Sequence, residues 1–196
     1  SHLRVLDRDP LFLRFVRLRR LPDERTLSRG LKSLTAPYCN QLNELLRDVA
    51  YQTCEEISLA RATIEFDGTV LRSSECVDGA ERGFSPHHPK DPSYYPLTAH
   101  LAQTGQLLGV WNRPGNVHDS VGAAEHLAAL LADVRRRLGS IPLEVRLDGA
   151  FFHEAVLGVL TASRVEYAVK VPMWKWLGVR QRIADDEELG NFPREL

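Results

Sequence analysis

Cysteine, methionine and long apolar runs are scarce in this sequence. Its 196 residues include one methionine and three cysteines, and no two cysteines stand in C-x-x-C spacing. An odd number of cysteines without paired spacing excludes a disulfide scaffold and a zinc ribbon and is typical of a reducing cytosol. Charged residues interrupt the N-terminal stretch every few positions, so it is neither a signal peptide nor a membrane span. We therefore expect a cytoplasmic protein that has no membrane partner.

Net positive charge is also absent. The sequence has 25 Lys and Arg against 26 Asp and Glu, a formal net charge of −1, which taken alone argues against a nucleic-acid partner. The distribution is uneven, because residues 1–36 contain nine basic and four acidic side chains while the rest has an excess of acid. A near-neutral total is therefore compatible with a DNA-binding protein whose positive surface is local.

The first sixty residues have the apolar spacing of helices. Apolar residues recur at helical intervals in PLFLRFVRLRRL, in TLSRGLKSL and in a longer segment after Pro37. The two short basic segments have the pattern of a helix-turn-helix that presents Arg25 and Arg29 to DNA phosphates, and an Arg-rich solvated helix face is an equally good interpretation. The sequence thus predicts an all-helical, basic, DNA-contacting region over residues 1–60.

After residue 61 the apolar pattern becomes strand-like. RATIEFDGTVLRS predicts a buried strand, and residues 72–96, rich in Gly, Pro, Ser and His, are predicted to be a long loop. YPLTAHLAQTG and QLLGVWNRPGN predict a hairpin. A helix from Ser120, which would cap it, to Leu138 follows, and then come the strand IPLEVRLDGAFF, a short helix and the strand VEYAVKV. The predicted order is three strands, helix, strand, helix, strand.

Two aspartates occupy equivalent positions in this order. Asp67 and Asp148 each follow an apolar strand and precede a glycine. Functional sites in α/β sheets are usually built at strand ends. Two carboxylates brought together there repel each other unless a cation lies between them, which indicates a site for hard metal ions. The alternative is that Asp-Gly is a common turn pair and that both side chains cap local backbone.

The segment IEFDGTV also looks like the nucleophile motif of haloacid-dehalogenase phosphatases, with Asp185 and Asp186 as the later acidic pair. Two features oppose this interpretation. Glu65 stands where that family has its nucleophilic Asp. That fold also needs a helical crossover between parallel strands, whereas a loop and a hairpin are predicted after Asp67. We keep the phosphatase as a second alternative function.

Several segments together resemble one known family. IEFDGTVL, RGFSPHHPKDPSYYPL, NRPGNVHDS, VRLDGAFF and VEYAVKV are similar to consecutive blocks of bacterial insertion-sequence DDE transposases, and RDPLFLRFVRLRRLPDERTLSR resembles the helical region upstream of their core. The resemblance covers nearly the whole chain. It implies an α/β fold with a ribonuclease-H-like mixed sheet over residues 61–196, preceded by the all-helical N-terminal region.

The resemblance also implies the chemistry. Asp67 and Asp148 are then the first and second catalytic acids and hold two Mg²⁺ ions, or Mn²⁺ in their place. The family's third acid is a Glu on a helix after the fifth strand; Glu187, Glu188 and Glu195 do not fit that place, so we expect a core that is incomplete at its C-terminus. The implied function is metal-dependent DNA strand cleavage and strand transfer at insertion-sequence ends, by a transposase fragment. An inactive remnant that only binds DNA or an intact subunit is the alternative.

Two loop segments suit contact with DNA. RGFSPHHPKDPSYY offers cations for phosphates and aromatic rings for an unpaired base, and NRPGNVHD forms a turn before the long helix. A stiff surface loop and simple turn hydrogen bonding are the respective alternatives. The candidate DNA-contacting residues are Arg82, His87, His88, Lys90, Tyr94, Arg113, Asn116 and His118. The expected partners are terminal inverted repeats and target DNA, with a homodimer for the complete protein, and the expected location is the bacterial nucleoid.

Overall fold

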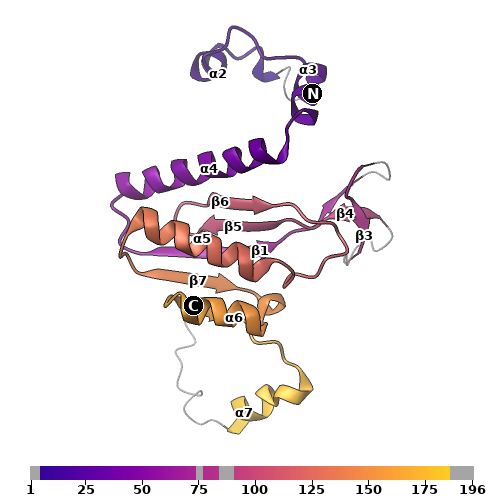
Figure 1. Cartoon of the computed structure of the whole chain (residues 1–196). Helices are drawn as coiled ribbons and strands as arrows, with labels where there is room; N and C mark the ends of the chain where they lie inside the picture. The colour runs from indigo at the N-terminus through magenta and orange to yellow at the C-terminus, as the bar shows by residue number, and fades with distance from the viewer. Residues whose placement is uncertain (1–4, 74–76, 84–90, 186–196) are drawn as a thin grey trace. The chain divides into compact units, whose positions relative to one another are not determined.

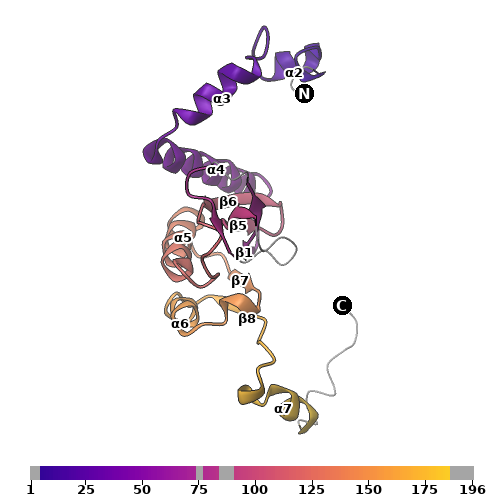
Figure 2. The same cartoon turned by 90° about the vertical axis from the view of Figure 1, so that its right-hand side faces the viewer.

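The computed structural model, drawn in two views in Figures 1 and 2, describes residues 5–73, 77–83 and 91–185. The chain divides into two compact units, residues 1–44 and residues 45–196. The domain boundary that the sequence predicts lies farther along the chain, at residue 60, and stays a prediction.

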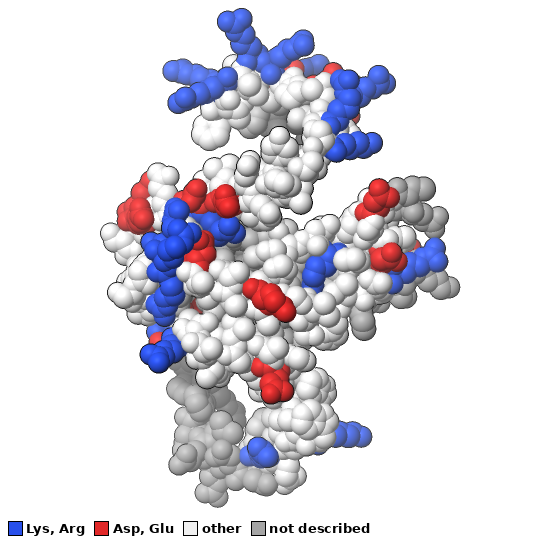
Figure 3. All heavy atoms as spheres, in the orientation of Figure 1, with Lys and Arg blue, Asp and Glu red and all other residues white. Residues whose placement is uncertain are grey.

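The first unit contains two short helices with side-chain caps. α2 spans Pro10–Phe15 and α3 spans Glu24–Lys32. Asp9 and Asp23 cap them by accepting hydrogen bonds from backbone N–H groups of the first turn, and Pro10 stands at the first helical position, where no donor is needed. Neither helix buries a residue. Lys and Arg side chains gather on this unit, as Figure 3 shows.

The helix α4, Ala36–Glu56, begins in the first unit, and its second half belongs to the second. This half buries Ala50, Tyr51 and Cys54 in the core. The Tyr51 hydroxyl donates a hydrogen bond to Asp133 Oδ2 at 2.9 Å, and loss of hydration together with this carboxylate raises the pKa of Tyr51 above its usual value. None of the described helices, α4 included, is both long and apolar enough to cross a bilayer.

Five strands of the second unit form one mixed sheet (Figure 1). They are β1 (Ala62–Gly68), β5 (Leu97–Leu101), β6 (Gln106–Trp111), β7 (Leu143–Leu147) and β8 (Glu166–Val169). Their order in the sheet is β6-β5-β1-β7-β8. The strand β5 runs antiparallel to both of its neighbours, whereas β1, β7 and β8 pair in parallel. This order and pairing confirm the predicted ribonuclease-H-like mixed sheet.

Two helices cover one face of the sheet. α5 (Ala123–Leu138) leads from β6 to β7, α6 (Glu154–Ala162) leads from β7 to β8, and both views show them on the same side. Strand side chains alternate between the two faces. Ile64 and Phe66 are therefore buried in the core, while Asp67 belongs to the exposed side of β1. After β8 the chain continues through η2 (Lys175–Leu177) and α7 (Val179–Asp185).

Two of the predictions about connecting segments are wrong. Part of the predicted loop 72–96 belongs to a second, three-stranded sheet, in the order β2-β4-β3. Its strands are β2 (Leu71–Arg72), β3 (Glu81–Arg82) and β4 (Pro92–Tyr94). Strands of two or three residues are too short to show a period of two, so the pattern missed them. Ser120 does not cap α5, which begins after Gly122 at a φ of 72° without a side-chain cap.

The haloacid-dehalogenase alternative is contradicted by the topology. The strand of the main sheet that follows β1 in the sequence is β5, and it pairs with β1 antiparallel. Within the described residues, α5 is the first helix after β1. That phosphatase fold requires a helical crossover to a parallel strand, because parallel neighbours cannot be joined by a hairpin.

Candidate functional site

The two predicted aspartates lie at the same end of neighbouring parallel strands. β1 and β7 pair with Phe66 opposite Leu147, so Asp67 and Asp148 each follow directly after this last pair. The aromatic rings of Phe66 and Phe151 pack edge to face beside them, with centroids 5.5 Å apart. The sheet therefore brings together two carboxylates that are far apart in the sequence.

Each aspartate also bonds local backbone. Asp67 Oδ1 accepts a hydrogen bond from the Gly68 N–H at 2.8 Å. Asp148 Oδ1 accepts one from the Ala150 N–H at 2.9 Å, at the start of the short turn η1, Gly149–Phe151. The capping alternative thus describes part of what these side chains do. Both residues are exposed, so their carboxylates stay accessible to a ligand.

Loss of hydration and two neighbouring carboxylates raise the pKa of Asp67. Desolvation is the largest cause, and Asp148 and Asp119 add like charge. The Gly68 N–H and His100 act in the opposite direction, because they stabilise the ionised form. Like charges gathered at one strand end favour the uptake of a proton or of a cation. The electrostatics of the site therefore favour the binding of a positive charge.

The structure brings Tyr95 and Asp119, one from each of the two loop segments singled out in the sequence, to the residue that follows Asp67. A β-carbon on Gly68 would come 2.8 Å from the Tyr95 hydroxyl oxygen and closer still to Asp119 Oδ1. Loss of hydration and the nearby carboxylate of Asp119 raise the pKa of Tyr95. Asp119 Oδ1 is buried and has no hydrogen-bond partner in the described part of the chain. The glycine after Asp67 and the His-Asp pair in NRPGNVHD are the signals that could have identified this contact.

The side chain of Arg113 donates hydrogen bonds to backbone carbonyl oxygens near the acidic residues. Only 8% of the residue is exposed. Its Nε donates to the Tyr95 carbonyl oxygen at 3.0 Å. Its Nη1 lies 3.1, 3.2 and 2.7 Å from the carbonyl oxygens of His118, Asp119 and Val121. Arg113 thereby fastens the turn that carries Asp119 to the segment that carries Tyr95, and its burial opposes the predicted contact with DNA.

Three of the predicted DNA-contacting residues, Arg82, Tyr94 and Asn116, lie at the second, three-stranded sheet. This sheet of β2, β3 and β4 is called the small sheet below. Tyr94 forms a β-bridge with Pro114, and its hydroxyl donates to the carbonyl oxygen of Asp78. A β-carbon at position 83, directly after Arg82, would collide with the backbone of Asn116. The turn that carries Asn116 therefore packs against the strand that carries Arg82, although the two are more than thirty positions apart.

The remaining predicted residues lie elsewhere. His118 is exposed, and its Nδ1 is 3.0 Å from Ser120 Oγ. Arg25 and Arg29 are exposed on α3, in the first unit. Predicted or weighed residues that lie outside the described part of the chain are His87, His88, Lys90, Asp186, Glu187, Glu188 and Glu195.

Asp67 and Asp148, together called the acidic site below, offer two carboxylate ligands to a hard divalent cation. Among the described residues, no group of three His, Cys, Asp or Glu side chains is placed to hold a metal ion. Asp67 and Asp148 supply carboxylate oxygens, and Mg²⁺ is usually bound through one or two carboxylates together with water and substrate phosphates. The residues present therefore fit a cation whose coordination is completed by a phosphate-bearing substrate.

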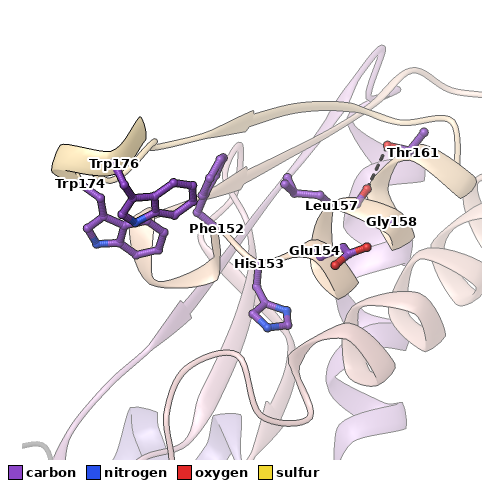
Figure 4. Close-up of a pocket in the computed structure, with 8 residues that line it drawn as sticks. All are labelled: Phe152, His153, Glu154, Leu157, Gly158, Thr161, Trp174 and Trp176. Atoms are coloured by element: carbon purple, nitrogen blue, oxygen red, sulfur yellow. Dashed lines mark hydrogen bonds between the residues drawn. The ribbon is translucent and has the colours of Figure 1, made fainter. Parts of the chain in front are cut away.

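An aromatic cavity of about 570 Å³ lies beside α6 (Figure 4). The indole rings of Trp174 and Trp176 stack in it with centroids 5.6 Å apart, and Phe152 packs edge-on to Trp174. Neither Asp67 nor Asp148 lines this cavity. A neighbouring cavity of about 620 Å³ is lined by both Asp148 and Trp174, so the aromatic cavity adjoins the Asp148 side of the acidic site.

One family model matches nearly the whole chain. It is described as Transposase DDE domain group 1, and it matches residues 2–188. No curated protein matches the sequence.

Several solved structures are similar to the chain at low sequence identity. The Mos1 transposase paired-end complex with left transposon end is 11% identical at a TM-score of 0.40, over 95% of this chain and 71% of that chain. The catalytic domain of Mos1 mariner transposase is 9% identical at a TM-score of 0.40, over 79% and 75%. The N-terminal ribonuclease H domain of a Mycobacterium tuberculosis protein is 15% identical at 0.25, over 57% and 81%.

Proposed function

Because this chain belongs to the family Transposase DDE domain group 1, we propose that this transposase cleaves and transfers DNA strands at insertion-sequence ends in a metal-dependent reaction. Asp67 and Asp148 are its first and second catalytic acids. The observation that supports the proposal most is the parallel pairing of β1 with β7, which brings both carboxylates to adjoining strand ends in a member of this family.

Asp67 and Asp148 would hold Mg²⁺ or Mn²⁺ through their carboxylate oxygens, two ions in the complete site. The chemistry that such ions would supply is activation of water or a 3′-hydroxyl for in-line attack and stabilisation of the leaving 3′-oxygen. The chain itself supplies the anionic oxygens. Loss of hydration and the like charge of Asp148 and Asp119 raise the pKa of Asp67, and a bound cation would offset this like charge.

The backbone orients these carboxylates. The Gly68 and Ala150 N–H groups each hold one carboxylate oxygen, which limits rotation of Asp67 and Asp148. Both residues are exposed at the strand ends, where a DNA backbone can reach them. Because the attacking group is water or a 3′-hydroxyl, no covalent bond between the enzyme and DNA is needed.

Two groups of residues bind DNA. The basic region over residues 1–60, with Arg25 and Arg29, binds terminal inverted repeats, since helix cations neutralise phosphates. Arg82 and Asn116, which share the small-sheet region with Tyr94, contact the DNA strand near the acids. The complete protein acts as a homodimer, in which two subunits hold the two element ends together with target DNA.

A nicking assay tests the catalytic assignment. The substrate is a supercoiled plasmid that carries the DNA flanking the coding sequence on both sides, and the full 196-residue chain is incubated with it in Mg²⁺ or Mn²⁺. Asp67→Asn and Asp148→Asn are each expected to abolish metal-dependent nicking. Glu55→Gln serves as the matched control, because it also removes one exposed carboxylate but lies on α4, before the opposite end of β1.

Two outcomes contradict the proposal. Nicking that survives Asp67→Asn would mean that the acidic site does not perform the cleavage. Binding to the flanking DNA without nicking, in every divalent cation, would favour the alternative of an inactive remnant that binds DNA or an intact subunit. The two results are distinguishable because binding is measured by gel shift on the same fragments.

A further inference from the structure

A third carboxylate lies beside the acidic site and has no role so far. Asp119 packs against Gly68, lies close to the Tyr95 hydroxyl and adds like charge at Asp67. It belongs to the turn that precedes α5, whereas the third acid expected from the resemblance follows β8. Its packing against Gly68, the residue next to Asp67, therefore needs a physical explanation.

We propose that Asp119 is a positioning residue of the acidic site, whose carboxylate strengthens divalent-cation binding at Asp67 and Asp148 without ligating the cation itself. The inference rests on the proposed function, because it takes Asp67 and Asp148 as the cation's ligands. It adds to that function a third acid, which lies in the turn before α5 and not after β8.

The first support is the closeness of the packing at Gly68. A β-carbon at this position would meet both the Tyr95 hydroxyl and Asp119 Oδ1 at less than ordinary contact distance, so with any other residue here Asp119, Tyr95 or both would have to move. Glycine directly after the first acid therefore permits an approach that no other side chain would allow. This contact brings the Asp119 carboxylate to the backbone of the strand end that carries Asp67.

The second support is an oxygen without a donor. Asp119 Oδ1 is buried and has no hydrogen-bond partner in the described part of the chain, and the same is true of Arg113 Nη2. A buried acceptor that lacks a donor lowers stability. A cation held by Asp67 and Asp148 would supply positive charge near Asp119, which is close enough to Asp67 to add like charge there.

The third support is the rigidity of the turn. Arg113 Nη1 holds the carbonyl oxygens of Asp119 and Val121 at 3.2 and 2.7 Å, so the turn cannot move independently of the segment with Tyr95. In this position Asp119 does not complete a group of three metal-binding side chains with Asp67 and Asp148; no such group exists among the described residues. The geometry therefore supports an effect through charge and hydrogen bonding, not ligation.

Cation binding is the readout that tests the inference. Mn²⁺ affinity of the full chain is measured by electron paramagnetic resonance of the free ion, without DNA. Asp119→Asn, which keeps the shape and removes the charge, is expected to weaken Mn²⁺ binding about 10-fold, the size typical for residues that support metal ligands. Asp67→Asn is expected to abolish binding, and Glu55→Gln to leave it unchanged.

The outcomes separate this inference from the proposed function. If Asp67→Asn keeps wild-type Mn²⁺ affinity, the proposed acidic site is wrong. If Asp67→Asn loses binding while Asp119→Asn retains it, the site stands and the role of Asp119 is overturned, since Asp119 then only packs. Should Asp119→Asn fail to fold, as judged by circular dichroism, Asp119→Ser removes the carboxylate with less volume at the crowded contact, and the same comparison applies to it.

Discussion

The guanidinium of Arg113 lies over the ring of Tyr95, with Cζ 5.3 Å from the ring centroid, and its Nε donates to the carbonyl oxygen of the same residue at 3.0 Å. One side chain thus holds the end of the segment before β5 and the turn before α5. Because Arg113 is 8% exposed, these bonds form in a largely dehydrated environment, where replacing them by water is difficult.

Arg113→Lys is expected to destabilise the fold by about 2–4 kcal/mol, because an ammonium cannot reproduce the fork of the guanidinium and leaves buried carbonyl oxygens without donors. The free energy of unfolding is measured by urea titration of the full chain. Arg146→Lys is the matched control: Arg146 is exposed and bonds carboxylates only, so its loss is expected to cost less than about 1 kcal/mol. Equal losses of unfolding free energy in the two variants would contradict the role of Arg113 in holding the two backbone segments together.

Gly68→Ala is expected to destabilise the chain by about 1–3 kcal/mol, the usual range for an added carbon in a tightly packed place. The new methyl group meets Asp119 Oδ1 and the Tyr95 hydroxyl, so one of them must move. Gly158→Ala is the control, since Gly158 is exposed in α6 with nothing within 4 Å of its β-carbon position. That variant is expected to gain up to about 1 kcal/mol from helix propensity. Thermal unfolding of both variants checks the opposite signs.

The main sheet and its helices could be predicted because their segments are long enough to show a period. Five or more residues of β1 and β7 show apolar alternation, and the stripe of α5 repeats over four turns. The strands of the small sheet are two or three residues long, so no period exists to be read. The cap of α5 was also missed, because Gly122 begins the helix through a backbone conformation that leaves no side-chain signal.

The acidic site could be predicted as far as it depends on position within a strand. Asp67 and Asp148 stand at equivalent places in two apolar segments. The parallel pairing of these strands then places the two residues at adjoining strand ends. Asp119 and Tyr95 meet only through the folding of a long connection around Arg113. No local sequence pattern predicts such a contact. The burial of Arg113 was not predictable either, and the buried side chain bonds backbone carbonyl oxygens where a DNA contact was predicted.

Asp67→Asn is expected to change the pH dependence of stability. The pKa of Asp67 is raised in the folded state above its ordinary value of 3.8, so the folded chain binds this proton more tightly than the unfolded chain. Ionisation of Asp67 therefore reduces stability as pH rises from about 3.8 through the raised folded pKa, and the reduction persists at higher pH. Without divalent ions, Asp67→Asn is expected to be slightly more stable than the wild type at about pH 7 and not at about pH 3.

Urea titrations at the two pH values, in a chelator, measure this difference. Because Asp67 is exposed and well screened, we expect less than about 1 kcal/mol. Added Mg²⁺ is expected to stabilise the wild type and not the variant, since a ligand that binds only the folded state shifts unfolding by mass action. A variant that is less stable than the wild type at the higher pH would contradict the raised pKa.

Arg25→Gln is expected to weaken DNA binding about equally for all sequences and to lower the salt dependence of that binding. Each phosphate contact that is lost reduces the slope of log K against log salt by about 0.9. The slope is measured by fluorescence anisotropy with a random-sequence duplex over a series of salt concentrations. Arg164→Gln is the matched control, because Arg164 is an exposed arginine of the second unit with no predicted DNA contact. Equal slopes for Arg25→Gln and the wild type would mean that this arginine lies on a solvated helix face, the alternative that its sequence pattern allows.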